Sequence, residues 1–111
     1  MIDEGIANAY AAAINNCDID ALLALFDQHA TVHNPAGSFT GLAEIRAFYE
    51  SVVFAGRAQL TVRSVVLNDN VTTAELAATS PLGEPGNELI AVDEFVRNDD
   101  GRIASLHIVY R

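Results

Sequence analysis

The stretch that decides the fold is residues 58–79, AQLTVRSVVLNDNVTTAELAAT, in which two β-rich runs flank the turn signal Asn68-Asp69-Asn70. Two more β-rich runs follow at residues 87–97 and 102–110, with the turn signal NDDG at residues 98–101 between them. Because these four strands follow one another in hairpin succession, we expect an antiparallel, curved sheet.

The residues before this sheet predict three helices. Residues 3–15 are rich in alanine, with apolar side chains at helical spacing, and Asp18 suits the N-cap of a second helix that runs to Phe26. Gly41 opens a third helix, whose apolar face contains Leu42, Ile45, Phe48, Tyr49 and Val52. The expected fold class is therefore α+β, with three N-terminal helices packed in the concave face of the sheet.

The connections between these elements are also visible in the sequence. Residues 30–34 predict a short strand, which stops at Pro35 because proline donates no backbone hydrogen bond. Residues 35–38 (PAGS) predict a turn, and residues 81–86 (PLGEPG) predict a longer connection.

Length and charge restrict what the chain can be. We expect one domain over residues 1–111, and the formal net charge of −9 argues against nucleic acid and anionic membrane as partners. The single cysteine, Cys17, forms no internal disulfide and suits a structural position at a helix–helix turn. With no signal-peptide pattern and no apolar run of membrane-spanning length, a cytoplasmic location is expected.

The strand at residues 87–97 is apolar on both faces. Ile90 and Val92 alternate with Leu89 and Ala91. A sheet covered on one side only normally carries polar residues on the other, so we expect a second copy of the chain on the outer face. The sequence thus predicts a homodimer.

Four polar residues interrupt apolar patterns. Asp93 shares a strand face with Phe95, so it is either a buried carboxyl, kept neutral by burial, or an exposed residue in a shifted register. Tyr10 lies on the apolar stripe of the first helix, either as a core tyrosine or as a donor to a ligand, and Tyr49 has the same two interpretations. Asn34 precedes a proline and is equally typical of a turn.

The histidines do not suggest a catalytic or metal site. His29, His33 and His107 have no metal-ligand spacing and are expected at the surface or an interface. The sequence also has neither a nucleophile elbow nor a glycine-rich phosphate loop, so we expect no metal and no organic cofactor.

The arrangement resembles the bacterial ketosteroid isomerases, within the cone-shaped α+β barrels that include scytalone dehydratase. The resemblance covers nearly the whole chain, and five stretches carry it: residues 9–15 (AYAAAIN), 18–26 (DIDALLALF), 30–38 (ATVHNPAGS), 45–49 (IRAFY) and 91–95 (AVDEF).

The resemblance implies roles for three of these residues. Tyr10 would donate a hydrogen bond to the carbonyl oxygen of the substrate, with Asp93 as a neutral carboxylic acid beside it, which is a known property of this family. Tyr49 would support Tyr10 through a hydrogen bond. Each donor would stabilise the enolate by roughly 3–4 kcal/mol, with no cofactor.

One residue departs from the family pattern. The family's general base is an aspartate, and the matching position here is Asn34, whose amide takes up no proton near neutral pH. Loss of a general base typically costs roughly 10²–10⁴-fold in rate. Asn34 is an introduced substitution, a natural change in a relative with altered chemistry, or a sign that another residue is the base; we favour the first, because Tyr10 and Asp93 are retained.

The expected substrate is an apolar small molecule. Residues 74–80 are small and polar where aromatic pocket walls are expected, and the remaining candidates for the wall are Tyr49, Phe54, Val65, Phe95, Leu106, Ile108 and Tyr110. The predicted function is a steroid Δ-isomerase that moves a double bond from Δ5 to Δ4 in a 3-oxo steroid, impaired by Asn34. The alternatives are a non-catalytic steroid-binding protein and a polyketide cyclase or dehydratase on the same fold.

Overall fold

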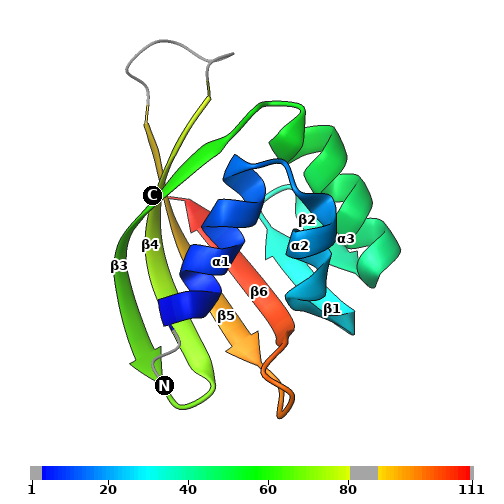
Figure 1. Cartoon of the computed structure of the whole chain (residues 1–111), viewed down its shortest axis with the longest axis vertical. Coiled ribbons are helices and arrows are strands. Elements are labelled where there is room, and N and C mark those ends of the chain that lie inside the picture. Colours follow the sequence, from blue (N-terminus) through cyan, green and yellow to red (C-terminus); the bar gives the residue numbers. More distant parts are fainter. Residues whose placement is uncertain (1–3, 81–87, 111) are drawn as a thin grey trace.

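The helices all lie on one face of a six-stranded sheet in the computed structural model, which describes residues 4–80 and 88–110 (Figure 1). The helical segments are α1 (Glu4–Asn15), α2 (Ile19–Ala24), α3 (Leu42–Phe48) and the π-helical turn η1 (Tyr49–Phe54). The strands are β1 (Phe26–Asn34), β2 (Gly37–Thr40), β3 (Gln59–Asn68), β4 (Val71–Thr79), β5 (Leu89–Arg97) and β6 (Ile103–Tyr110). The predicted α+β class, with helices packed on a curved sheet, is confirmed.

The sheet is mixed, so the expectation of a purely antiparallel sheet was wrong. The strand order is β2-β1-β6-β5-β4-β3, and β1 runs parallel to β6 while every other neighbouring pair is antiparallel. Hairpin signals fix the direction only of strands that follow one another, and β1 and β6 are far apart in sequence. Among the described strands β2 and β3 are the two edges, so the sheet stays open, and together with the helices it forms the expected cone-shaped α+β fold.

The first hairpin also differs from the expectation. The helix predicted to reach Phe26 ends at Ala24, and β1 begins at Phe26 rather than at residue 30. The Leu25 carbonyl accepts a hydrogen bond from the Ile103 N–H at 2.8 Å, so pairing with β6 replaces the last helical turn. Residues 37–40 form β2 instead of continuing the turn, and the connection predicted at residues 81–86 lies outside the described residues.

The third helix changes its geometry after Phe48. A π-helix has i→i+5 hydrogen bonds, and the Ala58 N–H donates to the Val53 carbonyl at 3.2 Å where η1 ends. The wider turn rotates the apolar face by about one residue relative to an α-helix. Val52, expected on the inner face, is therefore 57% exposed at the rim, and Val53 is half-buried in its place.

Two side chains fix the end of α1 and the start of α2. The Asn15 amide Nδ2 donates to the Leu60 carbonyl at 2.9 Å, and its Oδ1 accepts from the Leu60 N–H at 2.6 Å, which fixes the end of α1 on β3. Asp18 caps α2 as predicted, because its Oδ1 accepts from the Ala21 N–H at 3.1 Å. Cys17 is exposed, with φ of 50°, in the turn between α1 and α2.

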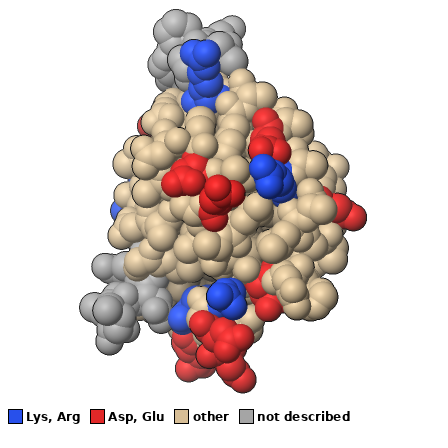
Figure 2. All heavy atoms as spheres, turned by 45° about the vertical axis from the view of Figure 1, so that its right-hand side comes forward, with Lys and Arg blue, Asp and Glu red and all other residues tan. Residues whose placement is uncertain are grey.

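The surface reflects the acidic composition. On the face drawn in Figure 2, acidic side chains are scattered between a few basic ones, in keeping with the formal net charge of −9. Within the described part of the chain, none of the helices is long and apolar enough to cross a bilayer.

Candidate active site

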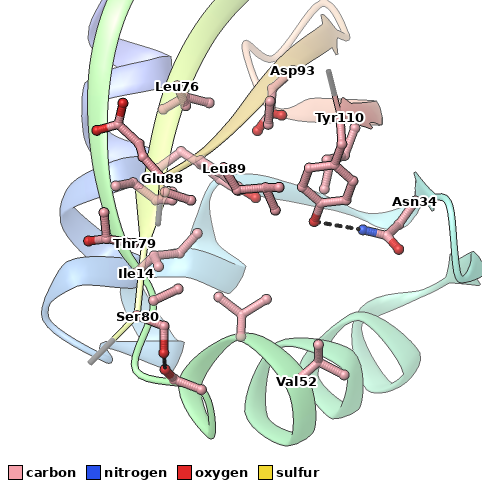
Figure 3. Close-up of a pocket in the computed structure, with 18 of the residues that line it drawn as sticks. Ile14, Asn34, Val52, Leu76, Thr79, Ser80, Glu88, Leu89, Asp93 and Tyr110 are labelled. Carbon is pink, nitrogen blue, oxygen red and sulfur yellow. Dashed lines mark hydrogen bonds between the residues drawn. The ribbon is translucent and has the colours of Figure 1, made fainter. Parts of the chain in front are cut away.

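A cavity of about 590 Å³ lies between the helices and the inner face of the sheet (Figure 3). Its volume is in the range of small-molecule sites, which are roughly 300–1,000 Å³. Most of its described lining is apolar, with polar groups from α1, β1, β4, β5 and β6. The described lining residues are Tyr10, Ile14, Asn34, Phe48, Val52, Val53, Gly56, Ala58, Leu60, Leu76, Ala78, Thr79, Ser80, Glu88, Leu89, Ala91, Asp93, Ile108 and Tyr110.

Asp93 is a buried acid on the cavity wall. It lies in the middle of β5, in register with Ala74 on β4 and Ile108 on β6, and is only 3% exposed. Its Oδ1 has no hydrogen-bond partner among the described residues. Burial raises the pKa of Asp93 to about 7, since the charged form loses hydration. The prediction that Asp93 faces the interior is confirmed, and the shifted register is wrong.

Two buried tyrosines form a pair next to this acid. The Tyr10 and Tyr49 hydroxyl oxygens lie 2.7 Å apart, and both residues are almost completely buried. Burial raises the pKa of both hydroxyls, and the nearby Tyr49 and Asp93 raise the pKa of Tyr10 further. The ring of Phe95 packs edge-on against Tyr10 at 5.2 Å. Tyr10 therefore stays protonated; its side chain contributes to the cavity wall, and Tyr49 lies behind it.

Asn34 lies at the outer end of the cavity. Its side-chain Oδ1 accepts from the Ala36 N–H at 2.8 Å, and its Nδ2 donates to the Tyr110 hydroxyl at 3.4 Å. Figure 3 shows this contact on the same side of the cavity as Asp93, with Ile14, Thr79 and Glu88 on the opposite side. Asn34 is thus both a turn residue, through its contact with the Ala36 N–H, and a residue of the cavity wall.

The structure brings together only part of the predicted pocket wall. Tyr10, Asn34, Asp93, Ile108 and Tyr110 line the cavity. The described lining does not include the other five candidates, which are Tyr49, Phe54, Val65, Phe95 and Leu106.

Packing explains why these five lie elsewhere. Phe95 and Leu106 face each other across β5 and β6 and are fully buried in the core. They lie two residues along the strands from the pair Asp93–Ile108. Tyr49 is fully buried behind Tyr10. Phe54 and Val65 are partly buried against the core outside the cavity.

Several wall residues were missed from the sequence. Leu76 shares the inner face of β4 with Ala74 and Ala78, so strand periodicity could have found it. Val53 carries no such signal, because only the π-helical turn brings it inward. Glu88 at the rim pairs with Arg63 on β3, with 3.3 Å between Oε1 and Nη1, and both side chains are about half exposed. Asp93 and Glu88 are the only carboxylates in the described lining.

The histidines lie away from the cavity. The rings of His33 and His107 stack at 4.2 Å on the outer face of the sheet, and the His33 ring contacts the Ser38 hydroxyl at 3.0 Å. Over residues 4–80 and 88–110, no group of three or more His, Cys, Asp or Glu side chains is placed to hold a metal ion. The chemistry that this arrangement supports is hydrogen bonding by neutral donors in an apolar cavity.

Comparisons with known proteins agree with this fold. A provisionally named polyketide cyclase from Sinorhizobium meliloti has a TM-score of 0.84 at 23% identity, over 98% of this chain and 95% of that one. A provisionally named ketosteroid isomerase from Kribbella flavida has a TM-score of 0.82 at 18% identity, over 96% and 76%. A Mycobacterium tuberculosis protein in complex with estradiol-17β-hemisuccinate has a TM-score of 0.80 at 14% identity, over 96% and 91%.

The sequence itself matches a family over most of its length. The SnoaL-like domain matches residues 7–106, which include Tyr10, Asn34 and Asp93. The matched range contains every helix after the first turn of α1 and all strands except the end of β6. The chain therefore belongs to the SnoaL-like domain family.

Proposed function

We propose that this protein binds an apolar carbonyl compound of steroid size and acts on it as a steroid Δ-isomerase, moving a double bond from Δ5 to Δ4 in a 3-oxo steroid. The observation that carries the proposal is that the buried Asp93 carboxyl, whose Oδ1 has no partner among the described residues, lines the same cavity as Tyr10. A buried polar group without a partner costs roughly 1–3 kcal/mol, so a ligand that forms a hydrogen bond with the Asp93 carboxyl is favoured.

The chemistry follows from the charge that develops during the reaction. A solvent water takes a proton from the carbon next to the ketone and returns it at the other end of the double-bond system, and in between the negative charge lies on the ketone oxygen. Tyr10 and protonated Asp93 donate hydrogen bonds to that oxygen from a site with little water. Because both donors are neutral, neither carries a formal charge into the apolar cavity. With a pKa of about 7, Asp93 is mainly protonated below neutral pH.

Asn34 makes this isomerase slow. Its amide has no proton-accepting capacity near neutral pH, and its Oδ1 is already occupied by the Ala36 N–H. In the family that the sequence resembles, an aspartate at this position carries the proton between the two carbons. Asn34→Asp keeps an oxygen for the Ala36 N–H, so the turn is retained while a base is added.

A second function is favoured by one observation. A general base works best with a pKa near the operating pH, and the pKa of Asp93 is about 7. With Asn34 unable to accept a proton, ionised Asp93 is the base of a cyclase or dehydratase-type reaction, and Tyr10 is the hydrogen-bond donor. The structural likeness to a provisionally named polyketide cyclase supports this candidate.

The experiment that tests the proposal compares Asn34→Asp with Asn34→Leu, which fills the site without adding a base. Conversion of a Δ5-3-oxo steroid to its Δ4 isomer is followed by ultraviolet absorbance. We expect Asn34→Asp to be faster than the parent by roughly 10²-fold or more, and Asn34→Leu to show no gain.

The other outcomes favour the alternative functions. Tight binding of a phenolic steroid without turnover in either variant favours the non-catalytic binding protein. If the protein neither binds nor converts the steroid, the steroid proposal is overturned. The reaction with Asp93 as the base then remains as the candidate, and Asp93→Asn is expected to abolish that reaction.

We also propose that the protein is a homodimer through the outer face of the sheet. The helices cover only the inner face (Figure 1), and Val66 and Val109 on the outer face are 63% and 59% exposed. Val92 and Val96, on the same face, are half-buried. A second copy of the chain removes these side chains from water.

A further inference from the structure

The outer end of the cavity carries a hydrogen-bond donor whose direction follows from chemistry. The Ala36 N–H can only donate, so the Asn34 atom that it contacts at 2.8 Å is the carbonyl oxygen Oδ1. The other end of the amide, Nδ2, therefore faces the Tyr110 hydroxyl at 3.4 Å. An amide nitrogen has no accepting lone pair, so the Tyr110 oxygen accepts this bond. The hydroxyl proton of Tyr110 is left to point elsewhere.

Tyr110 has no other hydrogen bond within the described residues. It lines the main cavity and also a second hollow of about 560 Å³, and Asn34 lines both as well. The second hollow extends toward Ser38, Glu44 and Ser51. The Asn34–Tyr110 pair thus lies at the junction of the main cavity and the second hollow. The Tyr110 hydroxyl can donate a hydrogen bond to a ligand in either space.

Tyr110 lies at a defined step from the inner donors. Asp93 is in register with Ile108 on β6, and Tyr110 is two residues further along the same strand and on the same face. Two strand residues span roughly 7 Å. If the carbonyl oxygen of a ligand contacts Tyr10 and Asp93, Tyr110 is therefore within reach of a second oxygen of the same ligand.

We propose that Tyr110, oriented by Asn34, is a second ligand anchor that donates a hydrogen bond to a second acceptor oxygen of the ligand. This inference rests on the proposed function, because it assumes that Tyr10 and Asp93 hold the first oxygen. The substrate class is then an apolar compound with two acceptor oxygens separated by roughly the 7 Å of two strand residues. A neutral acceptor suits this chain, whose net charge of −9 disfavours anionic ligands.

The test measures dissociation constants for two probes with the parent protein and three variants. One probe is a steroid dione, with ketones on its first and second rings; the other is the matched monoketone, with the first-ring ketone only. We expect the parent to prefer the dione, and Tyr110→Phe to weaken dione binding by about 2- to 10-fold while leaving the monoketone unchanged.

The control variants separate the two anchors. Tyr10→Phe removes the inner donor and is expected to weaken both probes alike. Asn34→Asp places a carboxylate beside Tyr110, and this carboxylate accepts the hydrogen bond that the Tyr110 hydroxyl would otherwise donate to the ligand. The preference for the dione is therefore expected to disappear, while the monoketone still binds.

Two results would overturn the inference. Equal losses for both probes in Tyr110→Phe would show that the residue contributes only packing, and a parent protein without preference for the dione would show that no second anchor exists. Binding of neither probe by the parent refutes the proposed function itself, whereas monoketone binding that depends on Tyr10 but no dione preference refutes only the second anchor.

Discussion

Replacing Asp93 by asparagine is expected to change how stability depends on pH. In the folded protein burial raises the pKa of Asp93 from its usual 3.8 to about 7, so the folded state holds a proton that the unfolded state releases between these values. The free energy of unfolding of the parent therefore falls as pH rises from about 4 to about 7 and is level above that range. Asparagine has no such proton, so the variant lacks this fall.

The size of the effect follows from the pKa shift. A shift of about 3 pH units corresponds to about 4 kcal/mol at roughly 1.4 kcal/mol per unit. Asp93 is 3% exposed, so solvent screening removes little of it. Relative to the parent, Asp93→Asn is expected to gain progressively more stability as pH rises, by up to about 4 kcal/mol at pH about 8.

The assay is urea denaturation of the parent and Asp93→Asn in steps from about pH 4 to about pH 9, at one protein concentration so that any association affects both equally. Asp99→Asn, at an exposed turn position, is the matched control and should keep the slope of the parent. Parallel stability curves for the parent and Asp93→Asn would refute the argument that the fold holds Asp93 as a neutral acid.

Three further predictions concern other parts of the chain. Tyr49→Phe removes the hydroxyl 2.7 Å from that of Tyr10, and should cost about 1–3 kcal/mol in denaturant unfolding and weaken phenolic steroid binding in calorimetry. Asp18→Ala removes the N-cap of α2 and should cost about 1 kcal/mol in the same unfolding assay; no loss would mean that the cap bond is unimportant. Val109→Glu places a charge on the outer face and should convert the proposed dimer to a monomer in light scattering; an unchanged mass would place any interface elsewhere.

Local patterns predicted the elements of this fold well. Alanine and apolar spacing indicated α1, Asp18 and Gly41 indicated the starts of α2 and α3, and turn residues separated the C-terminal strands. These signals depend on neighbours within a few residues, so the sequence carries them directly. The same periodicity placed Asp93 on the face of Phe95 and Tyr10 on the inner stripe of α1, and the structure has both there.

The wall of the candidate site was predicted less well, because strand and helix patterns specify a face and not a depth along it. Phe95 and Asp93 share a face, but α1 covers the level of Phe95, which fills the core, while the level of Asp93 opens into the cavity. Val53 reached the wall through a π-helical turn that no spacing rule indicated. The hydrogen bond from Asn34 to Tyr110 joins two residues that are 76 positions apart in the sequence, so no local pattern indicated it.

The sequence by itself determined the helices, the succession of strands, the position of Tyr10 on the apolar stripe of α1 and the strand face that Asp93 shares with Phe95, since each follows from short-range periodicity and capping. Only the tertiary structure decided that β1 lies parallel to β6, that the sheet stays open, and that Asn34 donates to Tyr110 at the cavity rim. These features are contacts between segments distant in the chain, and such contacts are selected by how whole surfaces pack and by which buried polar atoms find partners.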